Sequence, residues 1–176
     1  MPRHAWFILR PRRRLYRDLP PSSELTAASD TALGDWYVYH LVVDRHPLLL
    51  LVSSKSLLSL LVPARDVRAP PDHLPRLIGS RLRRLGVGEE LIGAELAAMT
   101  PVVVAPTVDR SVMGTVVDFA KNIPYCLEMG GWDDSTLPFV EARLAETPCH
   151  AARRFEEVIF PQHDAPKLLA QRWHAA

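Results

Sequence analysis

The chain has 176 residues, of which 48% are hydrophobic and 23% charged, and these proportions exclude a fully disordered chain. Its 21 basic and 20 acidic side chains give a formal charge of +1, which excludes a protein whose whole surface attracts nucleic acid. Two cysteines are too few for a disulfide-stapled fold, and without a CxxC pair they exclude a zinc ribbon or a thioredoxin-type site.

The first part of the chain carries the signals of a small sheet. Residues 5–10 are a short apolar run that predicts an opening strand, and the proline that follows predicts a short basic helix over residues 10–19. Residues 24–34 are small and polar and predict a loop. The aromatic and β-branched run at residues 36–43 predicts the clearest strand of the chain.

A β-hairpin is predicted at the centre of this sheet. A turn at residues 44–47 joins the strand at 36–43 to a second strand at 48–52, and a third strand is expected at 57–62. Along residues 36–43 both alternating sets of side chains are largely apolar. This pattern predicts a sheet that is covered on both faces.

The second part of the chain is predicted to be mainly helical. Apolar residues recur at helical spacing up to residue 85, and Gly86 and Gly88 end that helix. Asp109 is a good N-cap for a later helix, which Pro124 is expected to limit or kink. The predicted elements of this part are helices at 72–85, 89–99, 110–122 and 135–146, a strand at 101–105 and a last docking turn at 167–173.

Together these elements predict an α+β fold, with a small, mostly antiparallel sheet built on the central hairpin and packed with several helices. We expect residues 1–146 to form a single domain and residues 147–176 to form a C-terminal tail that docks on it. The tail or a second copy of the chain is expected to cover part of the apolar hairpin, so a homodimer is one expectation. The apolar stretch at 47–63 contains Lys55 and four serines and is too short to span a membrane, so we expect a cytoplasmic protein.

The most informative motif lies in the helix predicted at 110–122. Arg110, Gly114 and Asp118 stand one turn apart in a single row on this helix. A glycine inside a helix destabilises it by about 1 kcal/mol relative to alanine. We therefore expect that something approaches the helix closely at Gly114.

The chain resembles a bacterial family of uncharacterised proteins from about residue 36 to 127, and more weakly at residues 7–19. The family signature reads Arg-Ser-Val-x-Gly-x-x-x-Asp, and Arg110, Ser111, Gly114 and Asp118 match it together with the valine at position 112. The resemblance implies a compact intracellular α/β domain and brings no activity with it.

Two interpretations of the signature remain open. In the structural one, Arg110 and Asp118 tie down neighbouring strands, and Gly114 is a packing notch. In the functional one, Arg110 holds an anionic group, Ser111 at the helix N-terminus donates to it, and Asp118 orients Arg110. The second interpretation predicts an enzyme that binds an anionic small molecule in a concave pocket over the helix N-terminus.

No complete catalytic constellation accompanies the signature. Ser111 lacks a GxSxG elbow, and no two of the seven histidines have the spacing of metal ligands on a helix. The sequence also lacks a phosphate-binding glycine loop. We therefore expect no metal and no cofactor, and a binding or regulatory module rather than an enzyme.

An alternative function follows from the arginine-rich N-terminus. The first 17 residues carry six arginines and no acid, so with a total of +1 the remainder carries 1 − 6 = −5. Such an end could contact nucleic acid, as in a protein of a toxin–antitoxin or phage-defence operon, or it could contact an acidic protein partner. The arginines expected to make this contact are Arg10, Arg12, Arg13, Arg14 and Arg17.

Overall fold

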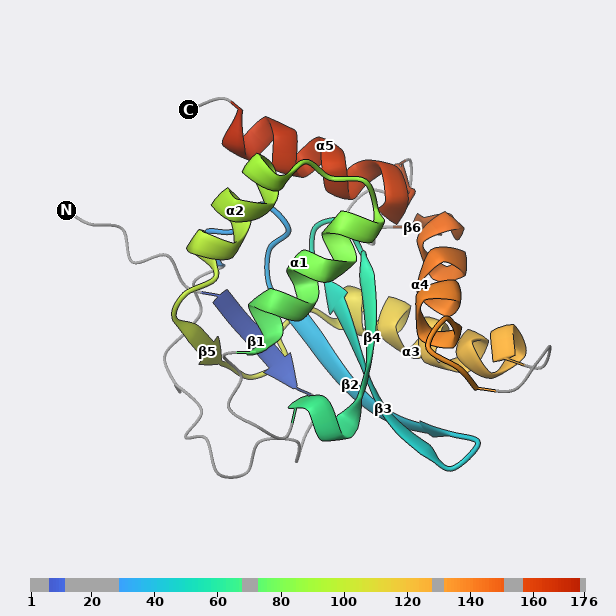
Figure 1. The fold of residues 1–176 in the computed structure, drawn as a ribbon. Coiled ribbons are helices and arrows are strands. Elements are labelled where there is room, and N and C mark those ends of the chain that lie inside the picture. The colour runs from blue at the N-terminus through green and yellow to red at the C-terminus, as the bar shows by residue number, and fades with distance from the viewer. Residues whose placement is uncertain (1–6, 12–28, 68–72, 128–131, 151–156, 175–176) are drawn as a thin grey trace.

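A computed structural model describes residues 7–11, 29–67, 73–127, 132–150 and 157–174. Within these ranges the fold is α+β, as expected, with a five-stranded sheet, a separate two-stranded sheet and five α-helices (Figure 1). The strands are β1 (Phe7–Pro11), β2 (Trp36–Val43), β3 (His46–Ser53), β4 (Ser59–Pro63), β5 (Val102–Val104), β6 (Cys149–His150) and β7 (Val158–Ile159). The helices are α1 (Leu74–Arg84), α2 (Glu89–Ala98), α3 (Arg110–Leu127), α4 (Thr136–Glu146) and α5 (Pro161–Trp173), with a short 3-10 helix η1 at Ala64–Val67.

The order of strands in the main sheet is β4-β3-β2-β1-β5. Strands β2, β3 and β4 form an antiparallel meander, which confirms the predicted hairpin and the third strand. Strand β1 lies parallel to both β2 and β5. This parallel pairing goes beyond the hairpin expected from the sequence, because a strand of five residues carries no local signal for its partners.

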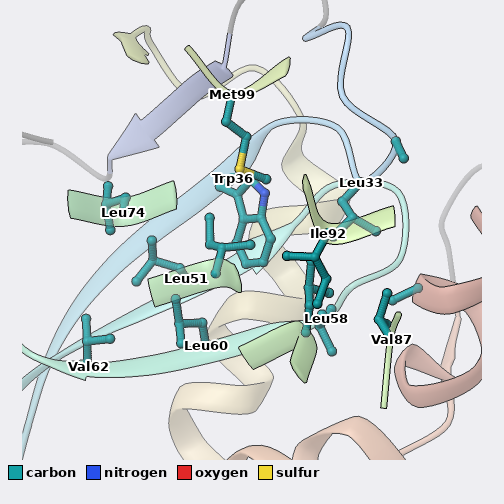
Figure 2. Close-up of a cluster of buried hydrophobic side chains, with 14 of the residues drawn as sticks. Leu33, Trp36, Leu51, Leu58, Leu60, Val62, Leu74, Val87, Ile92 and Met99 are labelled. Carbon is teal, nitrogen blue, oxygen red and sulfur yellow. The ribbon is translucent and has the colours of Figure 1, made fainter. Parts of the chain in front are cut away.

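Both faces of the sheet are covered, as the apolar pattern of β2 predicts. Trp36 and Val38 point to one face, where α1, α2 and α5 cover them, and Figure 2 shows Trp36 beside Met99 in this core. Tyr37 points to the other face, where α3 and α4 pack. Because successive side chains of a strand point to opposite faces, a single strand supplies both cores.

Two predicted helix boundaries are wrong. Helix α3 continues through Pro124 to Leu127, because Ile123 and Leu127 are buried in the second core and their packing offsets the hydrogen bond that proline removes. Helix α5 begins at Pro161, well before the docking turn expected at residue 167. The loop predicted at residues 24–34 is confirmed over the part that the structure describes, residues 29–34, where no helix or strand forms and most residues are buried.

The C-terminal helix belongs to the body of the fold. Helix α5 contacts α2 and α4, and its Ala165 and Leu169 are fully buried in the core beneath α1 and α2. Of the basic helix predicted at residues 10–19, Arg10 and Pro11 belong instead to strand β1, and residues 12–19 lie outside the described residues. Within the described part of the chain, no helix has the length and apolar character needed to cross a membrane.

Candidate functional site at the β4 edge

Helix α3 places the signature motif on the surface of the molecule. Asp109 caps the helix as predicted, and its Oδ1 accepts hydrogen bonds from the backbone N–H of Ser111 at 2.9 Å and of Val112 at 3.3 Å. The backbone N–H of Asp109 in turn donates to the hydroxyl of Tyr37 at 3.1 Å, which fixes the start of the helix against β2. The first free N–H groups of α3 therefore already have a carboxylate partner in the chain itself.

The structure does not bring Arg110 and Asp118 together. Eight residues of helix separate them by about 12 Å along the axis, and Asp118 pairs instead with Lys121, its Oδ1 lying 3.7 Å from Nζ. Both signature residues are exposed, so they do not tie α3 to the strands as the structural interpretation expects. Apart from its chain neighbours and the nearby backbone of α3, no atom of the described residues lies within 4 Å of the place where a Cβ on Gly114 would stand, so the packing notch is absent there.

The arginine-rich N-terminus lies largely outside the described residues. Arg12, Arg13, Arg14 and Arg17 fall in the range 12–28, and Arg10 is placed as part of the backbone of β1. Contact of these arginines with nucleic acid or with an acidic partner therefore stays a prediction.

A cavity of about 530 Å³ lies beside the edge strand β4. It is bounded by the start of β3, by β4 and η1, by α1, and by the first turns of α4 with the segment before it. None of its lining residues belongs to the signature motif. The lining residues are His46, Pro47, Leu48, Leu60, Leu61, Val62, Pro63, Arg65, Asp66, Leu77, Ser80, Arg84, Trp132, Asp133, Asp134, Leu137, Pro138 and Glu141.

A buried ion-pair network forms one wall of this cavity. The carboxylate of Glu141 is 1% exposed and accepts hydrogen bonds from the backbone N–H of Leu61 at 2.8 Å and from Nη2 of Arg84 at 2.6 Å. Nε of Arg81 lies 3.4 Å from the same carboxylate and donates to the carbonyl of Ser59 at 3.1 Å. Burial lowers the pKa of the Arg81 guanidinium, and the negative charge of Glu141 opposes that shift.

The same network closes the edge of the sheet. The carbonyl of Ser59 and the N–H of Leu61 belong to β4, which has β3 as a neighbour on one side only. Arg81 and Glu141 supply side-chain partners where a further strand would supply backbone partners, and Pro63 has no N–H to offer. The edge is therefore satisfied without a second strand beside β4, and the cavity lies beyond it.

The rim of the cavity is aromatic and acidic. The rings of His46 and Trp132 are stacked, with their centroids 4.1 Å apart. Oδ1 of Asp133 accepts hydrogen bonds from the hydroxyls of Ser135 and Thr136 at the start of α4, and these bonds lower the pKa of that carboxyl. Four carboxylates and two guanidinium groups line the cavity, so its formal charge without histidine is 2 − 4 = −2.

A family model described as a domain of unknown function, DUF6933, matches residues 8–164 of the chain. The chain belongs to this family. No curated protein and no solved structure matches it. Both the cavity and the signature row of α3 lie inside the DUF6933 match. The family, like the one that the sequence resembles, is described without a function, so it adds no activity.

The sequence signal for the buried ion pair of this DUF6933 chain is a charge inside an apolar stripe. Arg81 stands three residues after Ile78 on the buried side of α1, and Glu141 stands between Val140 and Leu144 on the buried side of α4. Charged side chains are almost never fully buried without a partner. Two such interruptions of opposite sign on two amphipathic helices could have predicted their contact.

A second buried carboxylate holds the loop at residues 29–35. Glu95 of α2 accepts hydrogen bonds from the backbone N–H groups of Ala32 at 2.8 Å and Leu33 at 3.0 Å. It also accepts one from Nε1 of Trp173 at 2.8 Å, so the loop, α2 and α5 meet at a single side chain. Burial raises the pKa of Glu95, and these hydrogen bonds oppose the rise.

Cys149 is an unfavourable nucleophile. The residue is buried, and this burial raises the pKa of its thiol to about 11, with a smaller contribution from the charge of Asp118. A thiol with this pKa is almost entirely protonated at neutral pH, and the thiolate is the reactive form. Within the described residues, no group of three or more histidine, cysteine or acidic side chains is arranged to hold a metal ion.

Proposed function

We propose that this chain is a binding module whose site is the cavity at the β4 edge, and that its ligand is a small organic cation with an apolar body. The observation that carries this proposal is the combination of apolar walls with a lining charge of −2. Cavities of about 300–1,000 Å³ with apolar walls and a few polar groups are typical of small-molecule sites.

The apolar walls come from three elements of the fold. Leu60 and Val62 of β4, Leu77 of α1 and Leu137 of α4 all line the cavity. Because the walls belong to a strand and two helices that also build the cores, the cavity is supported by rigid elements rather than by loops alone. These walls can remove the body of a ligand from water, which contributes roughly 25 cal/mol for each Å² of apolar surface buried.

The charge preference follows from which acids already have partners. Glu141 is held by Arg81 and Arg84, and Asp133 is held by the first turn of α4. Among the described residues, Asp134 forms no ion pair, and it lines the cavity together with Trp132. A carboxylate next to an indole ring offers a cation both a charge and a π-face, which favours an amine over a carboxylate or an alcohol.

Ligand-observed and protein-observed NMR titrations with hexylamine, hexanol and hexanoate test this proposal. Hexylamine is expected to bind most tightly of the three, and Asp134→Asn is expected to weaken its binding by about fivefold, as for a charge contact of roughly 1 kcal/mol. Glu90→Gln is the matched control, because Glu90 is an exposed acid on α2 outside the cavity. Ser80→Phe, which places a ring in the cavity from α1, is expected to abolish binding.

The proposal fails if hexanoate binds as tightly as hexylamine. It also fails if Ser80→Phe leaves the titration unchanged, because binding would then occur elsewhere on the molecule.

A further inference from the structure

Arg110, Gly114 and Asp118 form a row on α3, called here the signature row, and they are spaced symmetrically along the helix. Gly114 lies four residues after Arg110 and four residues before Asp118. On a helix these steps are about 6 Å each along the axis, and all three residues lie in one row. A positive and a negative side chain therefore stand at equal distances on either side of a glycine.

We infer that this row is a dimer interface, on which α3 of one copy packs antiparallel against α3 of a second copy with Gly114 on the two-fold axis. A two-fold interface brings the same surface of both copies together, with the direction of each helix reversed. The reversal puts Arg110 of each copy opposite Asp118 of the other. Two Arg–Asp pairs then form from a single helix sequence, and this self-complementarity points to a second copy rather than to an unrelated protein.

Gly114 is the residue that allows the two helices to meet. It is exposed, and a Cβ at this position would meet no described atom within 4 Å. Nothing inside the described part of the chain accounts for a residue that weakens an exposed helix by about 1 kcal/mol. On the two-fold axis, the missing side chain lets the two backbones approach closely.

The side chains of the row are free to change partners. Asp118 and Lys121 form a 3.7 Å pair in which both side chains are 72% exposed. Exposed pairs of this kind contribute about 0–1 kcal/mol, so an arginine of a second copy can replace the lysine at little loss. Charge pairs at an interface set orientation and partner choice more than affinity.

An exposed apolar residue lies near each end of α3. Val108, just before α3, is 62% exposed, and Tyr125, in its last turns, is 71% exposed. In the antiparallel arrangement, the late turns of one α3 extend past the beginning of the other, toward Val108 of the second copy. Burial of these two side chains supplies the apolar contact that the central charges do not, and tyrosine is enriched at interfaces.

The test is sedimentation velocity of the full chain and of two single variants, Arg110→Asp and Asp118→Arg, over concentrations up to about 200 µM, which covers weak dimers. The wild-type chain is expected to dimerise. Each variant alone places like charges opposite each other twice, and its dimer dissociation constant is expected to rise by about tenfold or more. An equimolar mixture of the two variants restores both opposite-charge pairs, and its dimer is expected to return to the wild-type affinity.

Gly114→Leu gives an independent readout, with Gly93→Leu as its matched control. Both glycines are exposed in helices, and a Cβ at either position meets no described atom within 4 Å. Gly114→Leu is expected to abolish the dimer without loss of melting temperature, whereas Gly93→Leu on α2 leaves the dimer intact.

A wild-type chain that is monomeric across the series would overturn the inference, and so would a dimer that both charge variants leave unchanged. Failure of the mixture to restore dimerisation would also overturn it. These results do not involve the β4-edge cavity, so they are independent of the ligand proposal.

Discussion

Removal of the charge of Glu141 is the most informative stability experiment that the structure suggests. Glu141 is 1% exposed, and its nearest guanidinium groups belong to Arg81, 4% exposed, and Arg84, 40% exposed. The change Glu141→Gln keeps a side-chain oxygen for the N–H of Leu61 and removes only the charge that the two arginines face. It therefore isolates the electrostatic part of the network.

The expected loss is about 3 kcal/mol in the free energy of unfolding. Breaking a buried pair typically destabilises a protein by about 3–5 kcal/mol, because one charge is left buried without its partner. The lower end applies because Arg84 is partly solvated and Arg81 keeps its hydrogen bond to the carbonyl of Ser59. For a domain of this size, the loss is a large fraction of a total stability of about 5–15 kcal/mol.

Urea denaturation followed by circular dichroism at constant pH measures this loss. Glu146→Gln is the matched control on the same helix, because its 3.6 Å pair with Arg143 is exposed and is expected to contribute less than about 0.5 kcal/mol. The double variant Arg81→Met, Glu141→Met is expected to lose less stability than the sum of its single variants, since neither charge is left alone. A loss below about 1 kcal/mol for Glu141→Gln, or strict additivity in the double variant, would refute the reasoning.

Three further predictions concern the buried and capping groups. Burial raises the folded-state pKa of Glu95, so the stability of the wild type relative to Glu95→Gln should fall as pH rises from about the unfolded value of 4.5 through the folded pKa. Urea titrations from pH 4 to 8 in which this relative stability stays constant or grows would contradict the prediction. Because burial raises the thiol pKa of Cys149 to about 11, this residue should react with iodoacetamide at pH 8 on the order of 100-fold more slowly in the native protein than in unfolding urea. Peptide mass spectrometry measures both rates, and equal rates would count against the burial of Cys149. Asp109→Ala should lower the free energy of unfolding by about 1 kcal/mol through loss of the α3 N-cap, whereas Asp109→Asn should keep most of the stability that the cap contributes. A loss of equal size in both variants would show that the charge of Asp109 matters rather than its capping hydrogen bonds.

The candidate site illustrates how far local patterns reach. The N-cap at Asp109 and the exposed row of Arg110, Gly114 and Asp118 are helical-spacing features, so the sequence is enough to find them. The cavity has no such signal, because its walls come from β3, β4, α1 and α4 and meet only when the sheet edge, two helices and the segment at Trp132 are packed. The buried pair of Arg81 and Glu141 is 60 residues apart in sequence, and neither charge alone identifies its partner, although the two interruptions of opposite sign taken together point to the contact.

The sequence by itself determined the elements whose side chains repeat with the period of their own backbone. The alternation along β2 is enough to predict a sheet covered on both faces, and the helical spacing of α1 predicts its buried stripe. The tertiary structure decided what depends on contacts between distant segments. The parallel place of β1 between β2 and β5, the passage of α3 through Pro124 and the burial of the loop held by Glu95 are of this kind. The physical reason is that backbone periodicity is a local property, whereas strand pairing and the burial of a carboxylate depend on which partners the rest of the fold brings within hydrogen-bond distance.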